Sequence, residues 1–231
     1  MALFFRRFAV PVVFVAVLCA VSLVYTYALR PAGQRSLVAA AATNLANLRS
    51  DPLGVLLASA FVSESGPWVW PVFAVVGLFP LVHRFGNLRV LLLIGAAHVI
   101  GTLVSEGLLA WRISTGAEPA SLRFLDDVGP SYVITSALLG TLLYGSASAV
   151  GAWRVFAASG WWRLAAAAAL GVLAPYIFAG LGRLDVAAVG HVVAMVTGAA
   201  VGFLLPRPVA PAGGAVVTER GSRRRWRPGA R

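Results

Sequence analysis

The sequence predicts an all-α membrane protein with six transmembrane helices, and its composition and the spacing of its apolar segments are the reasons. Hydrophobic residues make up 59% of the chain and charged residues 12%, whereas soluble domains carry roughly 25% charged residues. The mean hydropathy is +0.84. Apolar segments near the length of about 20 residues that a helix needs to cross a bilayer recur along the chain. These segments are expected to be helices, because a helix satisfies its own backbone hydrogen bonds in hydrocarbon.

Six apolar segments alternate with short segments rich in arginine, aspartate, glycine and proline. The expected spans are Phe8–Leu29, Trp68–Val82, Val90–Trp111, Val128–Ala149, Leu164–Leu181 and Val186–Leu205. The second is short and flanked by prolines, so it is the weakest of the six. Residues 1–7 are then an N-terminal segment, residues 8–205 the membrane domain, and residues 206–231 a basic tail that we expect to be disordered.

The distribution of arginine predicts the orientation, because cytoplasmic loops of membrane proteins accumulate positive charge. All 19 basic residues are arginine. If the N-terminus is cytoplasmic, the inner segments hold thirteen arginines and one acidic residue, whereas the outer segments hold six arginines and six acidic residues. Six spans return the C-terminus to the same side. The sequence therefore predicts a multi-pass protein of the cell membrane with both termini in the cytoplasm.

Two segments allow a second interpretation. The first apolar segment follows two arginines, as a signal peptide would, but it is longer than the apolar part of a signal peptide and five further spans follow it, which favours an uncleaved helix. The arginine-rich tail could indicate nucleic acid binding. On a membrane protein we instead expect it to contact anionic lipid, which attracts each arginine near the surface by about 1 kcal/mol, and we expect no nucleic acid partner.

Ionisable and nucleophilic side chains within the spans are candidates for function, because polar groups in the bilayer are costly. Counted from the expected outer ends of their spans at about 1.5 Å per residue, Ser131, Glu106 and His191 lie roughly 6, 8 and 9 Å below the outer surface. His98 lies about two turns deeper than Glu106. No further metal ligands cluster with His98, so neither a metal site nor a cofactor is expected.

A serine and a histidine at one depth on different helices suit nucleophilic catalysis. The imidazole takes the hydroxyl proton as the serine attacks a carbonyl carbon, and it then returns the proton to the leaving amine. Gly129 precedes Ser131 by two residues and Gly190 precedes His191. Small residues let helices approach closely, which favours contact between the two helices. Serine and histidine also occur in membrane helices merely as packing and hydrogen-bonding groups.

These residues resemble the motifs of the rhomboid intramembrane serine proteases, which have six core helices. The segment Gly129-Pro130-Ser131-Tyr132 is similar to the G-x-S-G nucleophile motif that opens the fourth rhomboid helix. The segment from His191 to Gly198 is similar to the H-x-x-G-x-x-x-G motif of the sixth. The resemblance implies a six-helix rhomboid-like bundle in which Ser131 is the nucleophile and His191 the general base. The substrate would be a membrane-spanning protein.

The chain also departs from the rhomboid pattern. Tyr132 stands where the motif has its final glycine, and the second span lacks the histidine and asparagine that help rhomboids stabilise an oxyanion. We hypothesise that Glu106 orients His191 or occupies the polar space left by the missing groups. Two alternatives therefore stay open: a catalytically inactive rhomboid-like protein that binds transmembrane helices, and a small transporter with His98 and Glu106 as a proton path.

Overall fold

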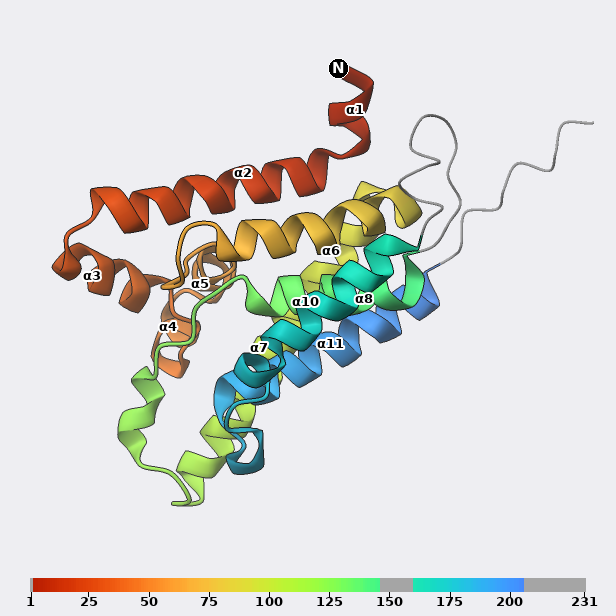
Figure 1. Ribbon diagram of the computed structural model, residues 1–231. Coiled ribbons are helices and arrows are strands. Elements are labelled where there is room, and N and C mark those ends of the chain that lie inside the picture. The colour runs from red at the N-terminus through yellow and green to blue at the C-terminus, as the bar shows by residue number, and fades with distance from the viewer. Residues whose placement is uncertain (1, 146–159, 206–231) are drawn as a thin grey trace, which may run out of the picture.

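The computed structural model describes residues 2–145 and 160–205, and this part of the chain is helical without strands. Figure 1 shows long helices packed side by side, with the short helices of residues 31–59 gathered at the left of the view. The long helices are α2 (Ala9–Leu23), α6 (Val69–Phe85), α7 (Asn87–Ser114), α8 (Ser131–Tyr144), α10 (Trp161–Ile177) and α11 (Val186–Leu204). The short ones are α1 (Ala2–Arg7), α3 (Pro31–Ala41), α4 (Leu45–Ser50) and α5 (Pro52–Ser59). A π-helical turn, η1 (Val24–Ala28), extends α2, and two 3₁₀ turns, η2 (Ala120–Phe124) and η3 (Leu181–Arg183), lie in loops.

Each expected span overlaps one of the long helices. Three stretches are long and apolar enough to cross a membrane: Ala9–Ala28, Asn87–Ser114 and Val186–Leu204. Helices α6, α8 and α10 are apolar but shorter, with 17, 14 and 17 residues. The short second span extends past its expected end at Val82 to Phe85, with Pro80 inside the helix. The expected end of the fourth span, Ala149, lies outside the described residues. The protein is thus a helical membrane protein with at least three helices of spanning length.

Helix α8 lies at the centre of the bundle, and all but one of its first eleven residues are buried. It packs against α6, α7, α10 and α11. Small residues bring the helices together: a Cβ on Gly101 of α7 would meet the backbone oxygen of Gly190 at 3.0 Å and the Cβ of Ala194 at 3.1 Å, both on α11. Close backbone approach of this kind is the usual basis of helix association in membranes. It holds α7 and α11 in contact at the depth of His191.

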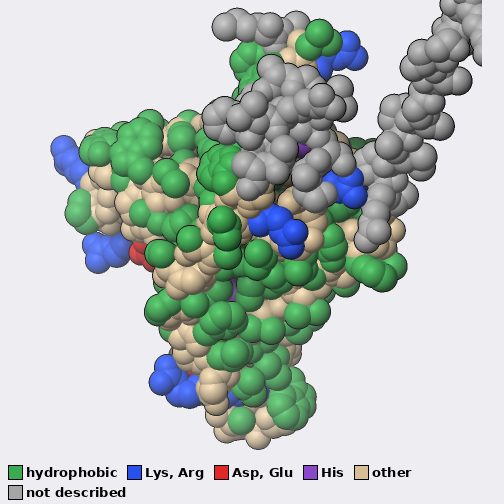
Figure 2. Space-filling model, turned by 45° about the vertical axis from the view of Figure 1, so that its right-hand side comes forward, with side chains coloured by type: hydrophobic (Ala, Val, Ile, Leu, Met, Phe, Trp, Pro, Cys, Tyr) green, Lys and Arg blue, Asp and Glu red, His purple; other side chains and the backbone are tan. Residues whose placement is uncertain are grey.

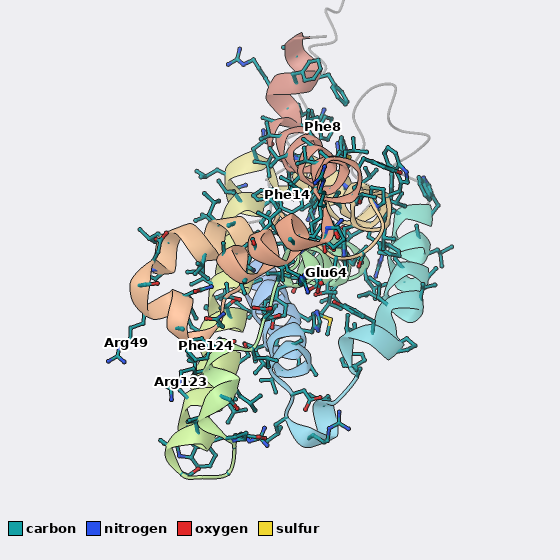
Figure 3. The ribbon with its side chains drawn as sticks, turned by 90° about the vertical axis from the view of Figure 1, so that its left-hand side faces the viewer. Phe8, Phe14, Arg49, Glu64, Arg123 and Phe124 are labelled. Carbon is teal, nitrogen blue, oxygen red and sulfur yellow. The ribbon has the colours of Figure 1, made fainter. Side chains whose placement is uncertain are left out.

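Helix α2 packs on the outside of this bundle through aromatic side chains. The ring centroids of Phe8 and Phe79 are 5.5 Å apart, and those of Phe14 and Phe61 are 5.0 Å apart. Figure 3 labels Phe8, the residue just before this helix, and Phe14 on it. Asn87, at the turn between α6 and α7, donates hydrogen bonds to the backbone oxygens of Arg6 and Arg7. These contacts attach the N-terminal segment to the bundle.

The surface in Figure 2 is largely hydrophobic, with few charged side chains on the face shown. Near the end of α7, Arg112 donates hydrogen bonds to the backbone oxygens of Arg183 and Leu184, at 3.0 and 3.1 Å. Arg112 also forms an ion pair of 2.6 Å with Glu118. These contacts of Arg112 therefore connect the end of α7 with the loop that follows it and with the turn before α11.

Candidate functional site

Ser131 is the first residue of α8, and the two residues before it explain why the helix begins there. Gly129 has φ +139°, a conformation that residues with a side chain rarely adopt. Pro130 is the N-cap, and its oxygen accepts the N–H of Ile134 at 2.9 Å. The first N–H groups of a helix have no partner within the helix. Ser131 is therefore held at a helix N-terminus, next to backbone donors that can bind negative charge.

Two loops from the N-terminal third of the chain hold the segment before Ser131 in place. The backbone N–H and the hydroxyl of Thr43, between α3 and α4, both donate to the backbone oxygen of Asp127, at 2.9 and 3.0 Å. The N–H of Gly129 donates to the backbone oxygen of Ser59, at the end of α5, at 3.0 Å. These bonds join segments about 70 to 85 residues apart in sequence, so the short helices help to position the serine.

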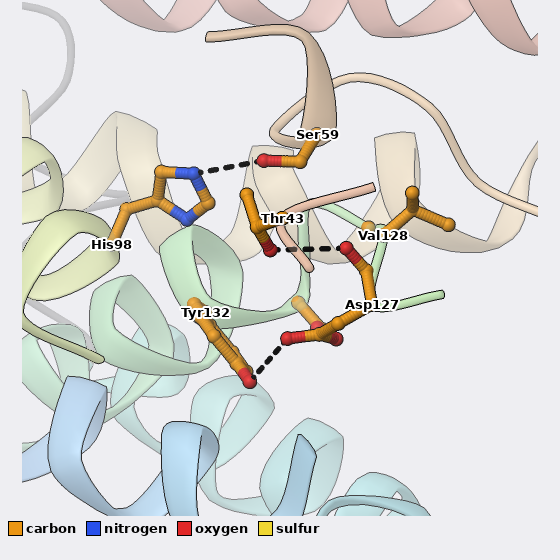
Figure 4. Close-up of a pocket in the computed structure, with 8 residues that line it drawn as sticks. Thr43, Ser59, His98, Asp127, Val128 and Tyr132 are labelled. Atoms are coloured by element: carbon orange, nitrogen blue, oxygen red, sulfur yellow. Dashed lines mark hydrogen bonds between the residues drawn. The ribbon is translucent and has the colours of Figure 1, made fainter. Parts of the chain in front are cut away.

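A small polar pocket lies in front of Ser131 (Figure 4). The pocket is lined by Thr43, Ser59, His98, Asp127, Val128, Gly129, Ser131 and Tyr132. His98 reaches the pocket from α7, and its Nε2 lies 2.8 Å from the backbone oxygen of Leu56 and 3.2 Å from Oγ of Ser59. Because a carbonyl oxygen can only accept, the ring proton of neutral His98 is on Nε2. Its Nδ1 is then an unprotonated acceptor, and it is buried without a hydrogen-bond partner among the described residues.

His191 lies on α11 and is 1% exposed. Its Nδ1 is 3.1 Å from the backbone oxygen of Ile177, at the end of α10. By the same reasoning Nδ1 carries the ring proton, and Nε2 is an unprotonated acceptor. Nε2 is buried, and none of the described residues forms a hydrogen bond with it. This is the tautomer that a general base requires, but in the part of the chain that the structure describes Ser131 and His191 share no hydrogen bond.

The ring of Tyr132 packs near both histidines. Its centroid is 5.0 Å from that of His191, in an edge-on arrangement, and 6.1 Å from that of His98. Its hydroxyl donates to Oδ2 of Asp127 at 2.8 Å. A Cβ on Gly190 would overlap the Tyr132 hydroxyl and ring. The tyrosine that replaces the motif's final glycine is therefore accommodated by a glycine on the facing helix.

The hydroxyl of Tyr132 also affects the charge at the entrance to α8. Burial raises the pKa of the Asp127 carboxyl above its ordinary value, and the hydrogen bond from Tyr132 opposes that shift by stabilising the carboxylate. Asp127 thereby connects the site to Thr43 through its backbone and to Tyr132 through its side chain.

Glu106 is 2% exposed, and neither of its carboxyl oxygens has a hydrogen-bond partner among the described residues. It interacts electrostatically with Asp127 and Tyr132. Gly101 of α7 touches Gly190 of α11. Glu106 lies five residues after Gly101 on α7, about 7.5 Å nearer the C-terminal end of that helix. Among the described residues no hydrogen bond joins Glu106 to His191 or Ser131, so a direct contact by which Glu106 would orient either catalytic candidate is absent.

Sequence reasoning did not find Thr43, Ser59 or Leu56 as part of the site. Each lies in or next to the short helices between the first two long ones, and nothing in their spacing distinguishes them from ordinary loop residues. The sequence singled out His98 by its depth but indicated none of these partners; the structure places His98 against Leu56, Ser59 and Tyr132. Within residues 2–145 and 160–205, no three His, Cys, Asp or Glu side chains are arranged to hold a metal ion.

The structure thus places a buried serine at the start of the central helix α8 and a buried histidine with an unprotonated Nε2 on the neighbouring helix α11. Comparison with known families agrees: the model of the family described as "Rhomboid-like protein" matches residues 4–208. The chain therefore belongs to the rhomboid-like protein family. No curated protein and no solved structure matches it.

Proposed function

We propose that this rhomboid-like protein is an intramembrane serine peptidase that cleaves membrane-spanning proteins, with Ser131 as nucleophile and His191 as general base. The observation that carries the proposal is the state of His191. Its Nδ1–H is engaged by the oxygen of Ile177, so the lone pair of Nε2 is available and has no competing partner among the described residues. A third group that orients the base in this way is a feature of activated nucleophiles.

In the proposed reaction, Oγ of Ser131 attacks the carbonyl carbon of the scissile peptide bond, and Nε2 of His191 accepts the hydroxyl proton. The N–H groups at the start of α8 stabilise the negative charge that develops on the carbonyl oxygen. His191 then gives its proton to the leaving amine, and water releases the acyl group from Ser131. The two side chains must come together for this reaction, and catalytic hydrogen bonds are often long until substrate binds.

The second candidate function is a catalytically inactive rhomboid-like protein that binds transmembrane helices. The position of Tyr132 favours it, because the ring packs edge-on against His191 in the region where the rhomboid motif has a glycine. The missing second-helix histidine and asparagine favour it as well, since loss of one oxyanion donor costs about 100- to 1000-fold in rate.

Labelling with an alkyl fluorophosphonate distinguishes the two candidates. We expect the purified protein to react, and Ser131→Ala and His191→Gln to abolish the reaction. Cys19→Ala is the matched control, because Cys19 is the only cysteine and it lies on α2, outside the site. If the wild-type protein remains unlabelled under conditions that label an active rhomboid protease, the peptidase proposal is wrong and helix binding is favoured.

We also propose that the chain crosses the cell membrane six times with both termini in the cytoplasm, and that the basic tail touches anionic lipid. The alternation of charge along the sequence supports this. Single cysteines introduced into a Cys19→Ala background at Ser36 and Leu88, both exposed, should react with an impermeant maleimide from opposite sides of the membrane. Equal reaction from one side would contradict the orientation. Replacement of the tail arginines by serine should weaken adhesion to vesicles containing phosphatidylglycerol.

A further inference from the structure

The polar atoms that line the pocket in front of Ser131 differ in whether they already have a partner. The hydroxyl of Thr43 donates to the backbone oxygen of Asp127. That of Ser59 lies 3.3 Å from the backbone oxygen of Leu56 and donates to it. Among the described buried side-chain atoms of this pocket, Nδ1 of His98 is the one without a hydrogen bond. Buried polar groups are nearly always hydrogen-bonded, so this atom indicates a missing partner.

The missing partner must be a hydrogen-bond donor. Leu56 holds the ring proton of His98 on Nε2, so Nδ1 offers a lone pair. In Figure 4 the second ring nitrogen of His98 points away from Ser59, toward the space beside Thr43 and Tyr132. His98 is 6% exposed, and its ring is fixed by Leu56 and Ser59. The pocket thus presents one oriented acceptor close to the proposed nucleophile.

An extended peptide bound at Ser131 carries donors of the required kind, because each of its backbone amides has an N–H group. Resting on the proposed function, we propose that Nδ1 of His98 accepts the backbone N–H of the substrate residue whose carbonyl Ser131 attacks. His98 is then a residue that positions the substrate. This contact to the substrate comes from α7. The second span, α6, contributes no residue to the lining of the pocket.

Two substitutions separate this contact from the structural role of the ring. His98→Gln places an amide near Nε2, so it keeps a donor for the oxygen of Leu56 but removes the acceptor at Nδ1. His98→Asn places an amide oxygen near Nδ1, so it keeps the acceptor but loses the bond to Leu56. A purely structural histidine would tolerate glutamine better, whereas a substrate acceptor would tolerate asparagine better.

The experiment measures the rate at which Ser131 reacts with three probes in the full-length protein. The first is a trialanyl diphenyl phosphonate, the second is the same compound with an ester oxygen in place of the N–H nearest the phosphorus, and the third is an alkyl fluorophosphonate without any amide. One hydrogen bond should make the amide probe react about 3- to 10-fold faster than the ester probe in the wild-type protein. We expect His98→Gln to reduce this ratio to about 1 by slowing the amide probe more than the other two probes, and His98→Asn to retain a ratio above 1.

Several results would overturn the proposal. A ratio that His98→Gln leaves unchanged would show that the N–H binds elsewhere, and equal slowing of all three probes would show that His98 acts on Ser131 itself or on the fold. Absence of labelling in the wild-type protein would instead refute the peptidase function. The ¹⁵N resonance of His98 Nδ1 then gives a separate answer: it should shift when the amide probe is added and stay unchanged with the ester probe. An equal response to both probes would reject the contact.

Discussion

The contact between Tyr132 and Gly190 is the sharpest structural feature to test. Tyr132 is 3% exposed, and its ring fills the space between α8 and α11. A methyl group on Gly190 would overlap both the hydroxyl and the ring of this tyrosine. Neither can move freely, because the hydroxyl bonds to Asp127 and the ring packs edge-on against His191.

Gly190→Ala should therefore destabilise the protein by about 1–3 kcal/mol, the usual cost of overpacking a filled core. For a chain of about this size, 1 kcal/mol shifts Tm by about 2–4 °C, so Tm should fall by about 2–12 °C. The assay is thermal unfolding in detergent. Gly107→Ala is the matched control: Gly107 is also helical, a Cβ there meets nothing within 4 Å, and alanine should be neutral or slightly stabilising.

A double-mutant cycle assigns the effect to the tyrosine. Tyr132→Ala alone should destabilise the protein by about 3–5 kcal/mol, the cost of removing a large aromatic side chain from a core. In the Tyr132→Ala background, Gly190→Ala should cost much less than in the wild type, because the overlapping atoms are gone. Equal Tm values for Gly190→Ala and Gly107→Ala, or strictly additive effects in the cycle, would refute the seating of Tyr132 against Gly190.

Three further predictions concern the segment that leads into α8 and the end of α7. Burial raises the pKa of Asp127, so the folded protein holds this proton more tightly than the unfolded chain does. Stability should therefore fall as the pH rises from about 4 through the raised pKa. In a pH series, the fall of Tm with pH should be smaller for Asp127→Asn than for the wild type, and an equal fall would contradict the raised pKa of Asp127. Gly129→Ala forces a side chain into φ +139°, which should destabilise the protein by about 1–3 kcal/mol and slow fluorophosphonate labelling of Ser131. Labelling as fast as in Gly107→Ala would be evidence that Gly129 does not position Ser131. Arg112→Ala removes two hydrogen bonds to the turn before α11, so amide hydrogen exchange in residues 178–185 should speed up, and unchanged exchange would mean that the turn holds without Arg112.

The sequence by itself determined the helices, because helix formation in hydrocarbon depends on local composition. Each expected apolar segment overlaps one long helix, and the ends agree within a few residues where the structure describes them. The resemblance to rhomboids was also readable from local motifs, and the family match over residues 4–208 confirms it. Gly129 shows why such motifs are informative. Its φ of +139° is readily adopted only by glycine, so the residue type indicates the local backbone conformation.

The tertiary structure alone decided what surrounds Ser131. The pocket joins residues from the loop after α3, from α5, α7 and α8, and no spacing along the chain encodes that meeting. Tyr132 packs near both histidines because its ring enters the space opposite Gly190, which depends on how α8 and α11 pack. The tautomers of His98 and His191 depend on the backbone oxygens of Leu56 and Ile177, 42 and 14 residues away. Depth in the bilayer follows from counting residues, whereas the direction of a side chain and its partner follow from contacts between distant segments.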